Sequence, residues 1–531
     1  MHVDKNNFEV EIIMVGNIKT LLQKNKIYFL AFLSGILLIT AFPPFELGFM
    51  AWLSLLPLLI ACMNSSPKKA FWVGFVFGLP LHLYTNFYLT HVLFPYLPTY
   101  LAVIALIALV CYISMFYGLF TAFASFAYQT GAAWFYSFSI PAAWLLIEYL
   151  RSLSFLAYNV GYLGYTQWDY PLILNLASVY GYWGLPFLMV FFQVILLGIL
   201  QQKYSRTPAY LVVGSFTLLL TSGLLLPQFM PLNEGEKKLN TALIQGNIHA
   251  EQVVEENRED IVEVYLGLTA EALHNEPQTD LVVWPETVAR INLATGKEHP
   301  RSIAALGEKY EIDLLYGARV RDNGVLYNSI AHLKPVQENL PLYHKHRLVP
   351  FVEYFPMEEL LNRLLNLDLL LGSYSPGEDI TIFNIQGIPV SGVICFESYF
   401  GDHTRLFAAQ GGRHIFVLTN DAWFGESIGL EQHAQAAAIR AAETGVGVTQ
   451  VANSGITISF DYQGRELFRS GKNVAAAYKL PLDFTTRETI YVRYGDYFPA
   501  FWILFLLIAT PATLLFRKKT LDNNHGSSGI S

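Results

Sequence analysis

A cysteine, a glutamate and a lysine each follow a short apolar run in the second half of the chain. Cys395 ends "SGVIC", Glu286 follows "LVVWP" and Lys345 follows "LYH". A thiol is an effective nucleophile only as the thiolate, so it needs a nearby base or cation. Each residue lies at the end of a predicted strand, where α/β sheets place their ligands. The pattern therefore predicts a cysteine nucleophile with a carboxylate and an ammonium group beside it.

The other two cysteines do not compete for this role. Cys62 and Cys111 lie inside apolar runs, where cysteine usually behaves as a small buried hydrophobe. Three cysteines this far apart lack the spacing of a zinc site. The alternating "HKH" at 344–346 sends its two histidines away from the lysine between them. We therefore expect a free thiol at Cys395, no metal ion and no cofactor.

The elements that must position these residues alternate between strand and helix. Six short buried runs are predicted as strands, at 239–248, 279–286, 313–320, 390–397, 414–421 and 446–453. Between them, 258–274 and 430–445 have helical spacing. This alternation favours an α/β layered domain, and about 260 residues are enough for it to bury its own core. On the second helix, Arg440 and Glu443 are expected to form a solvated pair.

The remainder of the chain is apolar enough to lie in a membrane. Of its 531 residues, 53% are hydrophobic and only 14% are charged, against about 25% charged in a typical soluble protein. Long apolar runs fall at 27–42, 49–62, 71–94, 99–126, 134–157, 172–200, 209–228 and 496–516. Because a bilayer core needs roughly 20 apolar residues per helix, we expect a bundle of about eight transmembrane helices. The net charge of −8 argues against nucleic-acid binding, which needs a basic surface.

Basic residues predict how this bundle is oriented. Lysine and arginine cluster before the first run, between the second and third, between the sixth and seventh, and after the eighth, which places them all on one side. We expect cytoplasmic ends at 1–26 and 518–531, seven helices in 27–231, an extracytoplasmic catalytic domain at 232–490 and a last helix in 491–517.

Two charged residues lie inside the fifth apolar run. Glu148 and Arg151 are three positions apart and so share one face of the predicted helix. Charges inside a membrane are usually functional. The sequence leaves two alternatives open, a functional pair and an internal ion pair that fixes the bundle.

Several short motifs make the chain resemble a known family. They are "QGNI" (245–248), "WPET" (284–287), "YHKHRLVPFVEYFP" (343–356), "CFES" (395–398), "TNDAWFG" (419–425) and "ANSGIT" (452–457), with "EYLRS" (148–152) and "GYLGYTQ" (161–167) in the apolar half. With these motifs the chain resembles the carbon–nitrogen hydrolase (nitrilase) superfamily, and within it the membrane-bound branch that acylates bacterial lipoproteins. The resemblance covers roughly residues 25–517 and implies an αββα sandwich.

The resemblance also implies roles for individual residues. Cys395 matches the nucleophile, Glu286 the general base and Lys345 the cation that stabilises the oxyanion. Glu353 matches a further carboxylate near the site, and Val352 stands where the family usually has glycine. The residues that match pocket-lining positions are Phe396, Glu397 and Trp423.

The activity implied by the resemblance is a two-step acyl transfer. Cys395 takes an acyl chain from a membrane phospholipid, with phosphatidylethanolamine as the expected donor, and passes it to the N-terminal amine of a diacylated apolipoprotein. The same triad suits a membrane-tethered amidase whose acceptor is water, whereas a non-catalytic sorting domain would normally have lost one of its three members. We expect a monomer in the bacterial inner membrane, with its catalytic domain on the periplasmic side.

Overall fold

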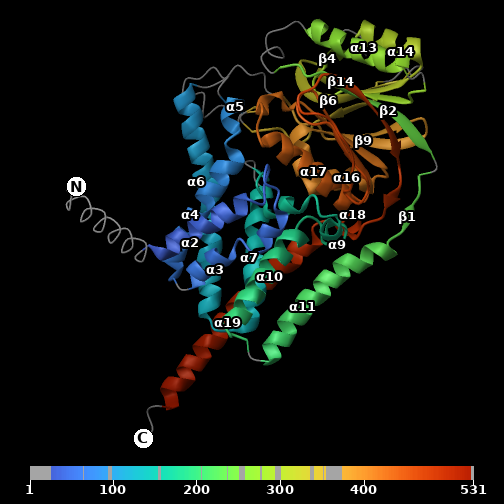
Figure 1. Cartoon of the computed structure of the whole chain (residues 1–531). Helices are drawn as coiled ribbons and strands as arrows, with labels where there is room; N and C mark the ends of the chain where they lie inside the picture. The colour runs from blue at the N-terminus through green and yellow to red at the C-terminus, as the bar shows by residue number, and fades with distance from the viewer. Residues whose placement is uncertain are drawn as a thin grey trace, which may run out of the picture.

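The chain forms a helical part and an α/β sandwich, and the sandwich is inserted before the last long helix (Figure 1). The computed structural model describes residues 25–63, 65–93, 98–153, 157–204, 206–235, 237–249, 258–275, 278–293, 300–334, 340–350, 352–354 and 374–527. The predicted cytoplasmic segment 1–26 lies almost wholly outside these residues.

Helices occupy all eight apolar runs. The longer ones are α2 (Lys26–Ile39), α3 (Leu56–Met63), α4 (Pro67–Asn86), α6 (Thr99–Gln129), α7 (Ala133–Leu153), α10 (Gly184–Leu200), α11 (Arg206–Leu225) and α19 (Tyr497–Ser527). Shorter ones are η1 (Gly48–Trp52), α5 (Leu89–Leu93), η2 (Leu163–Gln167), α8 (Pro171–Leu174), α9 (Leu176–Tyr180) and η3 (Leu226–Phe229). Among the described residues, three helices are long and apolar enough to cross a membrane, and one bent pair makes a fourth. The protein thus has membrane helices, while eight crossings stay a prediction.

The run at 172–200 forms a bent pair of helices and not the one continuous helix that its composition predicts. Its two halves, Pro171–Tyr180 and Gly184–Leu200, meet at an angle of 111°. Gly181 lies in the break with a φ of +66°, a conformation that costs glycine little. The next residue, Tyr182, donates its backbone N–H to Glu443 of the sandwich at 3.2 Å. The prediction of one continuous helix is wrong, because the chain bends at Gly181 and the bend places Tyr182 in contact with the sandwich.

The sandwich contains two sheets packed face to face. One has the order β14 (Ala476–Asp483), β2 (Lys238–Gln245), β3 (Leu281–Val283), β5 (Asp313–Asp322), β6 (Val325–Leu333), β7 (Leu342–His344), with β4 (Ala289–Asn292) also paired to β5. The other has the order β13 (Glu466–Arg469), β12 (Ile458–Phe460), β11 (Gly447–Ala452), β10 (His414–Thr419), β9 (Ile388–Ile394), β8 (Ile382–Ile385). β1 (Leu232–Asn233) and β15 (Thr486–Arg487) form a separate ribbon. All six predicted strands are confirmed.

Helices cover the outer face of each sheet, which completes the αββα architecture (Figure 1). α13 (Arg258–Asn275) and α14 (Arg301–Tyr310) cover the first sheet, and α16 (Gly401–Ala409) and α17 (Gly429–Thr444) cover the second, next to the membrane helices. α18 (Ile490–Tyr494) leads from the sandwich into α19. The two predicted helices correspond to α13 and α17.

Strand direction brings the predicted site residues to a common edge. β3 and β5 are parallel, and β7 follows β5 after two antiparallel pairings, so β3 and β7 point the same way. Glu286 and Lys345, which follow these two strands, therefore lie at one edge of the first sheet. Cys395 follows β9 of the facing sheet.

α17 corrects one prediction from the sequence. Every residue of this helix except Glu431 is buried, since one face meets the second sheet and the other meets the helical part. Arg440 and Glu443 are 2% and 0% exposed, and Arg440 Nε lies 2.9 Å from Glu443 Oε1. The expected solvated pair is a buried ion pair, because the membrane helices cover the face that would otherwise meet water.

Glu148 and Arg151 are both buried in α7 and hold the chain segment that follows it. Arg151 donates to the carbonyl oxygens of Tyr158 and Val160 at 3.2 and 3.3 Å. Glu148 accepts from the backbone N–H of Leu163 at 3.0 Å. These contacts favour a structural role, exercised through the 157–163 segment.

Candidate active site

The structure brings Glu286, Lys345 and Cys395 together between the ends of their strands. Lys345 Nζ lies 3.6 Å from Glu286 Oε1. The charges of both residues act on the pKa of the Cys395 thiol. A thiol, a carboxylate and an ammonium group thus lie near one another, and their catalytic roles stay a prediction.

Lys345 is held as an ammonium ion between two carboxylates. Its side chain is 1% exposed, and Nζ donates to Glu353 Oε1 at 3.0 Å and lies 2.9 Å from Oε2. Burial alone would lower the pKa of Lys345, but Glu353 and Glu286 outweigh it and raise the pKa above its usual value. Glu353 also accepts from the backbone N–H of Val349 at 2.8 Å, so it fixes this loop with the exposed Val352 beside it.

Glu286 is placed to act as a base. Its Oε1 accepts from Asn328 Nδ2 at 2.7 Å, and its Oε2 accepts from the backbone N–H of Asn420 at 3.0 Å. Burial raises the pKa of Glu286, and although Lys345 opposes this, the pKa stays above the usual 4.5. A carboxylate with a raised pKa takes up a proton more readily.

Asn328 is a site residue that the sequence reasoning missed. Its side-chain amide lies on β6 and donates to both Glu286 and Glu353, the latter at 2.8 Å. The backbone carbonyl oxygen of Asn328 accepts from the backbone N–H of Lys345 at 2.8 Å. The sequence contained little signal for it, because β6 also contains the polar residues Ser329 and His332.

Cys395 has a strained backbone and a thiol that is protonated at rest. Its φ is +50°, in the left-handed region that few non-glycine residues adopt, and such strain clusters at functional sites. Burial, followed by the charge of Glu286, raises the pKa of the thiol well above its usual value, while Lys345 lowers it. The thiol therefore needs a base to remove its proton, and Glu286 is a carboxylate close enough for its charge to act on the thiol.

Glu397 lies beneath the site and ties the cysteine turn to the lysine loop. Its carboxylate accepts from the backbone N–H groups of Ile394, His346 and Arg347 at 2.8, 2.7 and 3.0 Å. It also accepts from the Tyr343 hydroxyl at 2.8 Å. Glu397 is fully buried, so it supports the site from below and does not line the cleft at the neighbouring Phe396.

Replacing Glu397 with glutamine is expected to destabilise the fold. Burial alone would raise the pKa of Glu397, but His403 and backbone N–H groups such as that of Ile394 outweigh it and bring the pKa from 4.5 to about 2. At about 1.4 kcal/mol per pKa unit, the charged form stabilises the fold by on the order of 3 kcal/mol. This contribution is complete above pH 4.5 and is lost as the pH falls towards 2. Thermal unfolding of Glu397→Gln should show the loss at neutral pH, and wild-type stability in the variant would contradict it.

A cleft of about 360 Å³ opens next to Phe396, the residue that follows Cys395, and next to His346, the residue that follows Lys345; Cys395 and Lys345 themselves do not line it. Apolar side chains line much of it, including Phe396, Phe400, Leu348 and Pro350, and the helical part contributes Ala157. Phe396 thus lies where the resemblance implies, whereas Trp423 lies half-buried in the short helix η6 (Asp421–Phe424). A lining of this kind suits a hydrocarbon chain.

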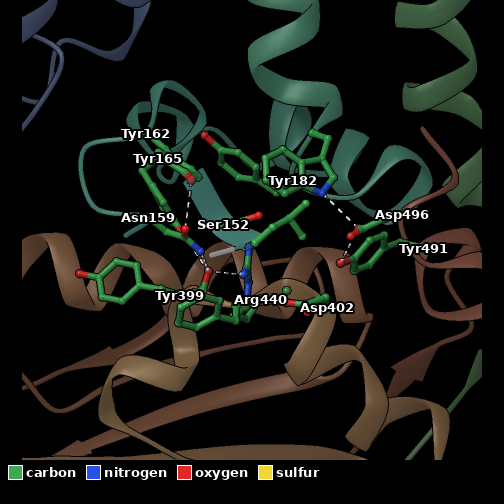
Figure 2. A pocket seen from close by; sticks show the side chains of 14 residues that line it. Ser152, Asn159, Tyr162, Tyr165, Tyr182, Tyr399, Asp402, Arg440, Tyr491 and Asp496 are labelled. Carbon is green, nitrogen blue, oxygen red and sulfur yellow. Dashed lines mark hydrogen bonds between the residues drawn. The ribbon is translucent and has the colours of Figure 1, made fainter. Parts of the chain in front are cut away.

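The short helix η5 (Cys395–Tyr399), which begins with the nucleophile, is held at its far end by both halves of the protein (Figure 2). The carbonyl oxygen of Tyr399 accepts from Asn159 Nδ2 at 3.0 Å and from the Tyr165 hydroxyl at 3.4 Å, both in the helical part. It also accepts from Arg440 of α17 at 3.1 Å. The position of the cysteine turn therefore depends on the helical part, through the loop that holds Asn159 and through η2, which holds Tyr165.

In the part of the chain that the structure describes, one group of side chains has the spacing of a metal site. It consists of Cys395, Asp421 and His433, whose ligand atoms lie within 4.8 Å of one another. The Nδ1 of His433 is already engaged by Asp421 at 2.9 Å, so an ion would have to replace that bond. The absence of a metal ion stays a prediction.

Comparisons with known proteins identify the family. Residues 34–195 match the apolipoprotein N-acyltransferase N-terminal domain, and residues 240–475 match the carbon-nitrogen hydrolase family. An apolipoprotein N-acyltransferase of Geobacter metallireducens is 31% identical over 507 residues, which cover 93% of this chain and 96% of the relative. The chain belongs to the apolipoprotein N-acyltransferase family.

Another apolipoprotein N-acyltransferase, from Pasteurella multocida, is 27% identical over 91% of this chain and 94% of its own length. Among solved structures, Nit3 of Saccharomyces cerevisiae, a nitrilase-superfamily member, aligns with 17% identity and a TM-score of 0.37 over 47% of this chain and 91% of its own. The first matched domain of the apolipoprotein N-acyltransferase family falls in the helical part of the structure, and the carbon-nitrogen hydrolase match falls in the sandwich.

Proposed function

We propose that this chain is a membrane N-acyltransferase that moves a fatty acyl chain from a phospholipid to the N-terminal amine of a diacylated apolipoprotein. The observation that carries the proposal is the cluster of Glu286, Lys345 and Cys395, with a largely apolar cleft at the neighbouring Phe396, in a chain of this family. Phosphatidylethanolamine is the proposed donor.

The first half-reaction loads the enzyme. Glu286 takes the proton of Cys395, and the thiolate attacks the sn-1 ester carbonyl of the phospholipid. The ammonium of Lys345, with the backbone N–H of Phe396, stabilises the oxyanion that forms. As the carbon–oxygen bond breaks, Glu286 returns the proton to the leaving oxygen. A lyso-phospholipid departs and a thioester remains on Cys395.

The second half-reaction transfers the acyl group from Cys395 to the lipoprotein. The lipoprotein amine attacks the thioester carbonyl, and Glu286 accepts a proton from the attacking nitrogen. The same two donors stabilise the second oxyanion. Collapse forms the amide bond and expels the thiolate of Cys395, which recovers its proton from Glu286.

Transfer is favoured over hydrolysis by the nature of the two substrates. Both carry hydrocarbon chains and reside in a bilayer, and the site is attached to the helical part of the protein through Asn159 and Tyr165. A water-using amidase of small soluble substrates has no need of such an attachment. The family membership supports the same choice.

The proposal includes an orientation in the membrane. Eight crossings put both termini in the cytoplasm and the sandwich on the periplasmic side of the inner membrane. The positions of lysine and arginine between the apolar runs support this arrangement. The proposed working unit is a monomer.

Trapping the intermediate tests the function. Purified full-length protein incubated with phosphatidylethanolamine alone should gain the mass of one acyl chain, located on Cys395 by peptide mass spectrometry. Adding a diacylated lipopeptide should discharge this adduct and produce an N-acylated peptide. Release of free fatty acid with no amide product would support the amidase alternative, and turnover without any adduct would rule out the covalent step.

A further inference from the structure

Beside Cys395 lies a buried histidine–aspartate pair for which the proposed mechanism has no use. His433 lies on α17 and is 1% exposed, and Asp421 lies in η6 and is fully buried. The two side chains meet at 2.9 Å, between His433 Nδ1 and Asp421 Oδ1. Asp421 Oδ1 also accepts from the Thr419 hydroxyl at 2.7 Å. The imidazole is thereby fixed in one orientation.

The second nitrogen of the ring contacts the nucleophile's own backbone. His433 Nε2 lies 3.1 Å from the carbonyl oxygen of Cys395, and the Ser398 hydroxyl lies at the same distance from Nε2. A carboxylate and a carbonyl oxygen can only accept hydrogen bonds, so hydrogen bonds to both need a proton on each ring nitrogen, whereas a neutral ring would accept from the Ser398 hydroxyl instead. The geometry therefore favours an imidazolium ion with Asp421 as its counter-ion.

The environment of the ring agrees with a positive charge. Burial lowers the pKa of His433, but Asp421, together with the Cys395 carbonyl and Glu286, outweighs this and raises the pKa above 6.5. The ring of Tyr399 stacks on the imidazole, with centroids 5.4 Å apart and planes 12° from parallel. This packing leaves the ring no freedom to turn towards another partner.

The bonded carbonyl belongs to a peptide unit that matters for acyl transfer. The Cys395 carbonyl and the Phe396 N–H are the two ends of one planar amide, so fixing the oxygen also fixes the direction of the N–H. A charged donor on the oxygen draws electron density from the amide and makes its N–H a stronger donor. The Phe396 N–H is one of the two groups assigned to the oxyanion.

We propose that His433, held by Asp421, is a positioning residue for acyl transfer, which orients and polarises the Cys395–Phe396 peptide so that the Phe396 N–H binds the oxyanion. The inference rests on the proposed function, because this donor matters only when a tetrahedral intermediate forms at Cys395. It assigns His433 no proton transfer and no direct action on the sulfur.

The test compares two reactions of the same thiol. Loading of Cys395 by phosphatidylethanolamine passes through an oxyanion, whereas alkylation by iodoacetamide displaces iodide and forms none. Losing an oxyanion donor outright costs roughly 10²–10³ in rate. We expect His433→Gln to slow loading by about 10-fold and His433→Leu by about 100-fold, since glutamine keeps an uncharged N–H donor. KM for the phospholipid and the alkylation rate should stay within about twofold of wild type.

Asp421→Asn provides a second variant, which keeps the side-chain shape and should slow loading in the same selective way. The matched control is a second buried histidine–aspartate pair among the described residues of the sandwich, His332 and Asp313, which are 2.7 Å apart on β6 and β5. His332→Gln should leave loading and alkylation unchanged.

The outcomes separate this inference from the proposed function. Wild-type protein that never acquires an acyl chain from phospholipid would overturn the proposed function itself. Wild-type protein that loads normally, with His433→Gln and His433→Leu loading at the same rate, would overturn only the role of His433. An equal loss of loading and alkylation would also overturn it, because the histidine would then act on the thiol or on the fold.

Discussion

Replacing Cys395 with alanine is expected to abolish both the acyl-enzyme and the N-acylated product. The sulfur forms the covalent bond in each half-reaction, and removing a nucleophile costs roughly 10⁶ in rate in a well-studied protease. Acylation of a diacylated lipopeptide, followed by mass spectrometry, measures the loss. Unfolding is not expected to contribute, because alanine fits in the space of cysteine and the hydrogen bonds of Glu397 to the backbone of this turn and of the lysine loop do not involve the Cys395 side chain.

The chain supplies its own controls for this experiment. Cys62 is buried in α3, where its thiol donates to the Leu59 carbonyl, and Cys111 is half-buried in α6. Neither is near the sandwich, so Cys62→Ala and Cys111→Ala should retain the adduct and the product. Residual acylation by Cys395→Ala above about one part in a thousand would contradict a covalent mechanism at this residue.

Replacing Glu286 with glutamine is expected to have the next largest effect. The amide cannot take a proton from Cys395, whose thiol pKa burial and the nearby carboxylate hold above its usual value. General-base catalysis is typically worth 10²–10⁴, so kcat should fall by roughly that factor. In wild type, activity should also fall on the acid side as Glu286 gains a proton, and this fall should occur above pH 4.5 because the pKa of Glu286 is raised.

Glu353→Gln is the matched control for that pH profile. Glu353 bonds the same lysine through both oxygens but is not assigned the proton. Its variant should lose activity because Lys345 is less firmly held, yet the acid limb of the profile should remain. Glu286→Gln should lack that limb. Finding the limb intact in Glu286→Gln, or activity within tenfold of wild type, would move the base to another residue.

Much of the sandwich could be predicted from local pattern. Its six predicted strands are short, largely apolar runs bounded by polar or turn residues, because parallel strands covered on both faces bury most of their side chains. Glu286 and Cys395 could be singled out because they lie at the ends of such runs, and Lys345 because it follows the short run "LYH". β14 was missed because it contains Lys479 and Pro481, which are unusual within a strand. It belongs to the sheet through its pairing with β2, which lies more than 200 residues earlier in the chain.

The supporting residues could not be predicted because their roles depend on packing between distant segments. Asn328, His433 and Asp421 look like ordinary polar residues until the two sheets and α17 come together. Arg440 and Glu443 have the spacing of a surface pair, and only the membrane helices that cover α17 remove them from water. The bend after α9 could not be predicted from hydropathy either, because it accompanies a contact between Tyr182 and the sandwich, and hydropathy carries no information on such contacts.

The three hydrogen bonds on the Tyr399 carbonyl have a practical consequence for anyone seeking a soluble form of this enzyme. A fragment of residues 232–490 would keep Glu286, Lys345 and Cys395. It would lack Asn159 and Tyr165, so Arg440 would be the remaining one of the three donors to the Tyr399 carbonyl oxygen. The helical part therefore helps to position the cysteine turn, and a fragment that lacks it should not be expected to keep the geometry of the site.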